Sequence, residues 1–305
     1  MDIDKKLKQA LLEKLSNFHQ SLPVYSIKKL SYVEMIDNSK YYASQFTGSD
    51  SDKSFRCPQR KDDLTLINLS LDTKMRIYHN SNTIIIERKM KPFENVFENG
   101  IEKEFDKKQL SEITINEMNR LELDKLKLSF EHVEFERLWQ IKASSMTIEK
   151  TREPIVLCRI VGAFRRHINK IPVLGGASIF VKIAGRRQIQ SIGIDWRQIK
   201  EKPLNNVKIT NPEIAAEKLL KNLNSSLPNS VLTLEDYKPE FFALGYFSMP
   251  KRQQQNYMQP VYVAMFESVS GTTFNKSLVI PATTHAYEPV TIAPEALMSK
   301  KKVKK

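Results

Sequence analysis

The sequence has little cysteine and no long apolar run. Its 305 residues include two cysteines, Cys57 and Cys158; a single disulfide would be an unusual framework for this length, so we expect two reduced thiols. No stretch of 18 apolar residues occurs, which excludes a membrane-spanning helix. The first residues, MDIDKKLKQALLEKL, lack the basic start and apolar segment of a signal peptide. We therefore expect a cytoplasmic protein; the alternatives are export by another route and a leader already removed.

Catalytic and phosphate-binding motifs are also absent. The sequence contains no Gly-x-Ser-x-Gly, Walker A, Gly-x-Gly-x-x-Gly or His-Glu-x-x-His pattern. None of the five histidines has another ligand residue at helical metal spacing. His132, flanked by Glu131 and Glu134, is the nearest candidate, and a solvated strand face explains it better. We therefore predict no enzyme, no catalytic residue, no metal and no cofactor; an enzyme whose site is assembled from distant residues is the alternative.

Basic residues are in clear excess. The chain has 48 Lys and Arg against 35 Asp and Glu, a formal net charge of +13. This balance predicts affinity for an acidic partner, whether protein, nucleic acid or an anionic lipid surface. Five of the last six residues are lysine, and we expect 291–305 to be a disordered basic tail.

The most regular apolar pattern lies between residues 155 and 197. Alternating apolar and polar residues predict three antiparallel strands, at 155–168, 172–184 and 188–196. Asn169-Lys170 suits the first tight turn because Asn tolerates the left-handed conformation, and Gly185 opens the second turn. Because apolar residues recur at every second position, one face of this meander is expected to pack against a core.

Helical patterns precede two groups of strands. Helices are predicted at 2–20, 111–128 and 211–223, the last with Thr210 or Asn211 as cap and Pro212 in its first turn. For the second segment, a strand that starts at Leu121 is the alternative. Further strands are predicted at 64–71, 83–88, 133–148, 231–234, 241–247, 261–267 and 277–281. This order predicts an α+β fold, a helix packed on an antiparallel β-meander, repeated in two tandem units. The predicted divisions are an N-terminal helix and strand segment at 1–110, units at 111–205 and 206–290, and the tail at 291–305.

The central meander resembles the PepSY and thermolysin-propeptide (FTP) type of domain. The resemblance rests on a basic pair, a turn, an Ile-Pro-Val-x-Gly segment and a glycine turn between strands. In this sequence these are Arg165-Arg166, Asn169-Lys170, Ile171 to Gly175 and Gly185, with strands at 179–183 and 189–194. The helix at 211–223 and the strand around 258–263 resemble a second, divergent copy. The resemblance implies a non-catalytic module that acts as an inhibitor, chaperone or scaffold.

Basic residues gather at the turns of this meander, and the predicted binding residues are Arg165, Arg166, Lys170, Arg186 and Arg187. The first three lie near one hairpin end and the last two at the opposite end, which argues against one tight anion pocket. The predicted function is a non-catalytic protein-interaction or regulatory module that uses a sheet edge or face. The alternative is a polyanion-binding protein that uses the basic turns and the lysine tail.

Overall fold

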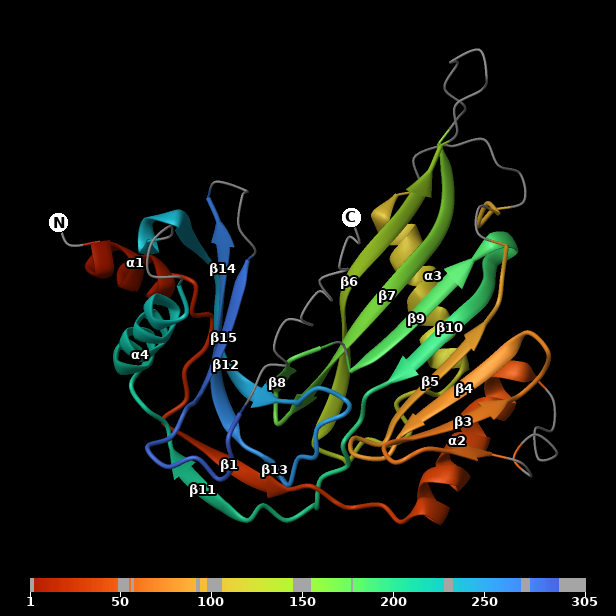
Figure 1. Ribbon diagram of the computed structural model, residues 1–305, viewed down its shortest axis with the longest axis horizontal. Coiled ribbons are helices and arrows are strands. Elements are labelled where there is room, and N and C mark those ends of the chain that lie inside the picture. Colours follow the sequence, from red (N-terminus) through yellow and green to blue (C-terminus); the bar gives the residue numbers. More distant parts are fainter. Residues whose placement is uncertain are drawn as a thin grey trace, which may run out of the picture.

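One large sheet runs through both halves of the chain (Figure 1). The computed structural model describes residues 3–48, 55, 58–91, 94–97, 106–144, 155–176, 178–227, 233–269 and 275–290. In chain order the elements are α1 (Ile3–Leu12), β1 (Ser21–Ser26), α2 (Tyr32–Thr47), β2 (Gln59–Arg60), β3 (Leu64–Asn68), β4 (Thr73–Tyr78), β5 (Thr83–Arg88), α3 (Lys107–Arg120), β6 (Glu131–Ala143), β7 (Val156–Ile168), β8 (Ile171–Leu174), β9 (Ile179–Ala184), β10 (Gln188–Ile194), β11 (Asn205–Lys208), α4 (Pro212–Ser225), β12 (Tyr237–Phe247), β13 (Tyr257–Met258), β14 (Pro260–Ser268) and β15 (Lys276–Pro281).

The order of the strands joins the two halves. The large sheet has 12 strands in the order β15-β14-β12-β8-β7-β9-β10-β5-β4-β3-β2, with β6 paired to β7. Its neighbours are antiparallel except β8 and β12, which run parallel over Val173↔Tyr246 and Leu174↔Phe247. A smaller sheet, in the order β11-β1-β13, lies beside it. No helix in the described residues is long and apolar enough to cross a membrane.

The predicted helix on an antiparallel meander, in two tandem PepSY-like units, is wrong. Helices and a largely antiparallel sheet are present, but the 12-stranded mixed sheet replaces two separate small ones. The predicted strand at 172–184 is divided, because β8 pairs with β7 only briefly and then runs beside β12. Gly175 makes this departure possible: its φ is +115°, and a Cβ there would collide with the carbonyl oxygen of Ser248. The backbones of the two halves therefore meet at a glycine.

Two helices cover one face of the first half of the sheet. In Figure 1, α3 lies behind β7 and β9, and α2 lies on the same side near β3 and β4. Their buried residues, such as Met118 and Tyr42, join a core with Ile160, Ile183 and Trp196. In the second half, α1 and α4 pack on β12 and β15 around Leu219, Phe242 and Tyr262.

Several elements differ from the sequence prediction. The helix predicted at 2–20 ends at Leu12, because Leu15 pairs its backbone with Phe242 of β12, and residues 21–26 form β1. The elements that the sequence analysis missed include α2, β1, β2, β4 and β11. The helix at 211–223 is confirmed as α4, with Asn211 as its cap and Pro212 in its first turn. Cys158 is a buried free thiol, while Cys57 and the tail 291–305 lie outside the described residues.

We expect Ser31→Ala to destabilise the protein by about 1 kcal/mol, because it removes the cap of α2. The Ser31 hydroxyl accepts a hydrogen bond from the Glu34 amide at 3.2 Å, and the Glu34 carboxylate accepts one from the Ser31 amide at 2.8 Å. Hydrogen exchange tests the effect: the first turn of α2 should exchange faster, while α4 should not change. Equal protection of α2 in both proteins would contradict this role of Ser31.

Candidate functional site: the uncovered face of the sheet

The adjacent arginines Arg165 and Arg166 point to opposite faces of β7. Arg165 is partly exposed, donates to the carbonyl oxygen of Val173 at 2.8 Å and forms an ion pair with Glu136. Arg166 is only 1% exposed and forms an ion pair with Glu131. Arg166 therefore acts inside the protein, and Arg165 is the member of the pair that a partner can reach.

The other three predicted residues lie in turns. Lys170 is exposed in the β7–β8 turn, where both Asn169 and Lys170 have positive φ. At the β9–β10 turn, Arg186 pairs with Glu94 at 2.9 Å, and Arg187 stacks over the ring of Phe97 with 4.7 Å to the centroid. Lys170 thus lies at one end of the meander, and Arg186 and Arg187 lie at the other end. The five predicted binding residues therefore do not line one common pocket.

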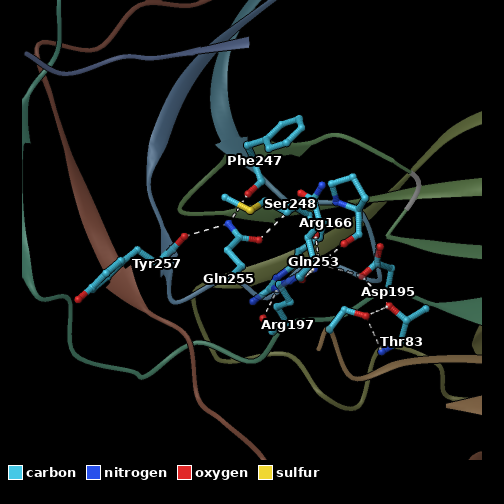
Figure 2. A network of polar contacts seen from close by, with 12 residues as sticks. Thr83, Arg166, Asp195, Arg197, Phe247, Ser248, Gln253, Gln255 and Tyr257 are labelled. Carbon is cyan, nitrogen blue, oxygen red and sulfur yellow. Dashed lines mark hydrogen bonds and ion pairs between the residues drawn. The ribbon is translucent and has the colours of Figure 1, made fainter. Parts of the chain in front are cut away.

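Arg166 belongs to a buried polar network at the junction of the two halves, part of which Figure 2 shows. The Arg166 guanidinium packs over Trp196, 4.3 Å from the ring centroid, and donates to the carbonyl oxygen of Arg197 at 2.7 Å. The Arg197 guanidinium reaches across to Ser248 Oγ at 2.9 Å and to the carbonyl oxygens of Pro250 and Gln253. The network thereby ties β7 and the end of β10 to the loop that follows β12.

The carboxylate of Asp195 and the side-chain amide of Gln255 complete the junction network. Asp195 accepts a hydrogen bond from Thr83 Oγ1 at 3.0 Å and lies 3.4 Å from an Arg197 nitrogen. Burial raises the pKa of Asp195, while the two arginines and the Thr83 hydrogen bond oppose the rise. Gln255 donates to the carbonyl oxygens of Phe247 and Tyr257 and accepts from the Met249 amide. Most polar atoms of this network are partnered within the protein, although Arg197 Nε and Trp196 Nε1 have no hydrogen-bond partner among the described residues. The network holds the two halves together.

The opposite side of the first half carries accessible side chains. Cross-strand partners point to the same face, so Trp139, Val161 and Lys182 form one row, and Ile141 and Arg159 lie in the next. This face is the one that α2 and α3 do not cover. We call it the uncovered face and define it by Arg137, Trp139, Ile141, Arg159, Val161, Phe180 and Lys182.

Large apolar side chains lie exposed on the uncovered face. Trp139 is 43% exposed and Ile141 is 41% exposed. The Arg137 guanidinium covers part of Trp139, at 4.8 Å from its ring centroid. Phe180 lies against Gly193 so closely that a Cβ at residue 193 would overlap its ring. Exposed aromatic and aliphatic groups beside charged ones are typical of a protein-binding surface.

Two cations on this face form no ion pair with a carboxylate in the described part of the chain. Arg159 donates to the side-chain oxygen of Gln190 at 2.8 Å and makes no ion pair there. Lys182 is half-buried; burial lowers the pKa of its ammonium, Arg159 lowers it further, and Glu87 opposes the change. Two partly desolvated, neighbouring positive charges favour an anionic group from outside.

Three possible metal ligands lie at the same side of the β6–β7 ribbon: His132, Glu134 and His167. Sequence reasoning considered His132 with its neighbours in the chain and missed His167, which is its register partner on β7. The pairing of His132 with His167 follows from the register of β6 against β7. The spacing of neighbouring residues in the sequence does not reveal this register. His132 and Glu134 lie two residues apart on one strand, so they share a face, and His167 joins them across the ladder.

No protein-family model and no curated protein matches the chain. Among solved structures, the chain is similar to an uncharacterized protein from Eubacterium rectale ATCC 33656, whose crystal structure was determined at 1.45 Å resolution. The two chains share 11% sequence identity, and the match covers 92% of each chain with a TM-score of 0.52. At this identity the likeness shows the fold alone.

Proposed function

We propose that this protein is a non-catalytic interaction module that binds an acidic segment of another protein on its uncovered face. The observation that carries the proposal is the pair Arg159 and Lys182, which forms no ion pair within the described residues and lies in the same rows as exposed Trp139 and Ile141. An acidic side chain would pair with these cations, and an apolar neighbour in the same segment would cover Trp139. A regulatory role as inhibitor, chaperone or scaffold follows from such binding.

The same face argues for a protein partner over nucleic acid. Carboxylates already occupy part of it: Glu136 lies between Arg165 and Arg137, and Glu87 pairs with Arg76 at 2.8 Å. Closely spaced phosphates would be repelled by these carboxylates, whereas a peptide can place its few charges between them. Aromatic rings do not follow one another along a basic groove here, as stacking of successive bases requires. Polyanion binding through Lys170, Arg186, Arg187 and the tail is the second candidate function, supported by the net charge of +13.

A pair of charge-reversal variants separates the two functions. Arg159→Glu with Lys182→Glu and Arg186→Glu with Arg187→Glu change the net charge equally, but on the uncovered face and on the β9–β10 turn respectively. We expect the first variant to bind a partner captured from source-cell lysate at least tenfold more weakly, because it replaces the cations with repelling charges at the centre of the contact. The second variant should bind like the wild type.

The measurement is an affinity titration with the captured partner, repeated at low and high salt, and with oligonucleotides as a separate ligand. Trp139→Ala should also weaken partner binding while leaving thermal stability nearly unchanged, because the side chain is 43% exposed. Unchanged binding by the Arg159→Glu, Lys182→Glu variant would refute the proposed face. Strongly salt-dependent oligonucleotide binding that is lost in the Arg186→Glu, Arg187→Glu variant would favour the second function.

A further inference from the structure

His132, Glu134 and His167 form a compact set of three ligand side chains. One ligand atom from each residue can be chosen so that all three atoms lie within 4.8 Å of one another. Glu134 Oε1 lies 3.0 Å from His132 Nε2, and Glu134 Oε2 lies 3.6 Å from His167 Nε2. Both imidazoles thus already direct the same ring nitrogen toward one carboxylate.

These distances fit the ligand spacing around a tetrahedral zinc ion. With metal–ligand bonds of about 2.0–2.1 Å, neighbouring ligand atoms in such a site lie roughly 3.4 Å apart. The two imidazole rings are stacked, with centroids 4.7 Å apart and an angle of 9° between their planes. A rotation about the Cβ–Cγ bond, which is a soft torsion in histidine, tilts the rings so that both nitrogen lone pairs converge.

The surroundings leave Glu134 available to the histidines. Arg165 is the cross-strand partner of Glu134, yet its guanidinium is bound to Glu136 and to the carbonyl oxygen of Val173.

We propose that His132, Glu134 and His167 bind a divalent transition-metal ion of the Zn²⁺ class, leaving a fourth position open to water or to another ligand. Two imidazoles select such an ion over Mg²⁺ or Ca²⁺, which prefer oxygen ligands. The Glu134 side chain is 59% exposed and the His132 side chain 39% exposed, so an ion reaches the site from solvent without opening the fold. The three ligands lie on β6 and β7, as part of the uncovered face does, but none of them is among the residues that define that face, so the metal proposal is tested separately from the proposed partner.

Metal titration of the full-length protein tests the proposal. After treatment with a chelator, the protein should bind one Zn²⁺ per chain in competition with a chromophoric chelator. Co²⁺ should give the visible absorption of a tetrahedral site. His132→Ala and Glu134→Gln should each weaken Zn²⁺ binding at least tenfold. Removal of a residue that only hydrogen-bonds to a metal ligand already lowers metal affinity by at least this factor, and removal of a ligand itself should lower it no less.

His19→Ala is the matched control, since His19 is an exposed histidine outside the set, and it should bind Zn²⁺ like the wild type. Glu134→Gln keeps the shape of an exposed side chain, so it remains informative if a histidine variant folds poorly. Absence of stoichiometric Zn²⁺ binding by the wild type would overturn the proposal. Equal Zn²⁺ affinity in the wild type, His132→Ala and Glu134→Gln would overturn it as well.

Discussion

Replacing Arg166 by methionine is expected to lower the free energy of unfolding by about 3–5 kcal/mol. Methionine keeps much of the apolar stem but removes the guanidinium, which donates twice to one carboxylate oxygen of Glu131. The Glu131 carboxylate then stays buried without its positive partner, and the carbonyl oxygen of Arg197 loses its donor. Urea unfolding followed by circular dichroism measures the loss.

Arg165→Met is the matched control, because it makes the same change one residue away on the other face of β7. Arg165 pairs with Glu136 where both side chains are partly solvated, at 17% and 22% exposure, so we expect a loss of about 1 kcal/mol or less. Combining Arg166→Met with Glu131→Gln should cost less than the sum of the single changes, because the stranded charge is then absent. Similar losses for Arg165→Met and Arg166→Met would refute the distinction between the two arginines.

Arg165 and Arg166 show which structural features the sequence predicts and which it does not. The alternating pattern correctly predicted a strand at 155–168, and alternation alone requires that Arg165 and Arg166 face opposite sides. Which side is buried depends on the helices, and α2 was not predicted although its signals are present. Ser31 and Glu34 form a capping box, and Gly48 ends the helix in the left-handed conformation. However, α2 packs on β4 and β5, whereas Arg166 is buried against Glu131 and Trp196, and only the long-range strand register brings these partners to it.

Long-range pairing explains the remaining errors. The turn at Asn169 and Lys170 and the start of α4 depend on neighbouring residues, and both were predicted correctly. The parallel contact of β8 with β12 joins residues that lie more than 70 positions apart and involves only two register pairs. A pairing of two residues is too short to produce an alternating apolar pattern in the sequence, so it could not be predicted from one. The His132–His167 pair likewise depends on the β6–β7 register, and the row of Trp139, Val161 and Lys182 depends on the β6–β7 and β7–β9 registers together.

Gly162→Ala is expected to destabilise the protein by about 3 kcal/mol, near the upper end of the usual cost of overpacking. Gly162 lies on the covered face of β7, directly under α3. A Cβ at this position would lie 2.5 Å from the Cβ of Thr114, which is fully buried in α3. Because the backbone of the strand and the side chain of the helix touch, the added methyl group must push α3 away from β7 and loosen the core that both share. Chemical denaturation measures the change.

Gly176→Ala provides a control of opposite sign. A Cβ at Gly176 meets nothing within 4 Å, and its φ lies outside the left-handed region, so this change should leave stability unchanged or raise it by up to about 1 kcal/mol. Thr114→Gly removes the atom that blocks residue 162, at a cost of about 1 kcal/mol for a helical glycine. The double variant Gly162→Ala, Thr114→Gly should therefore be more stable than Gly162→Ala alone. Strictly additive losses would show that Thr114 does not set the distance between α3 and the sheet, and α3 would then owe its position over β7 to its other buried residues, Leu110 and Met118.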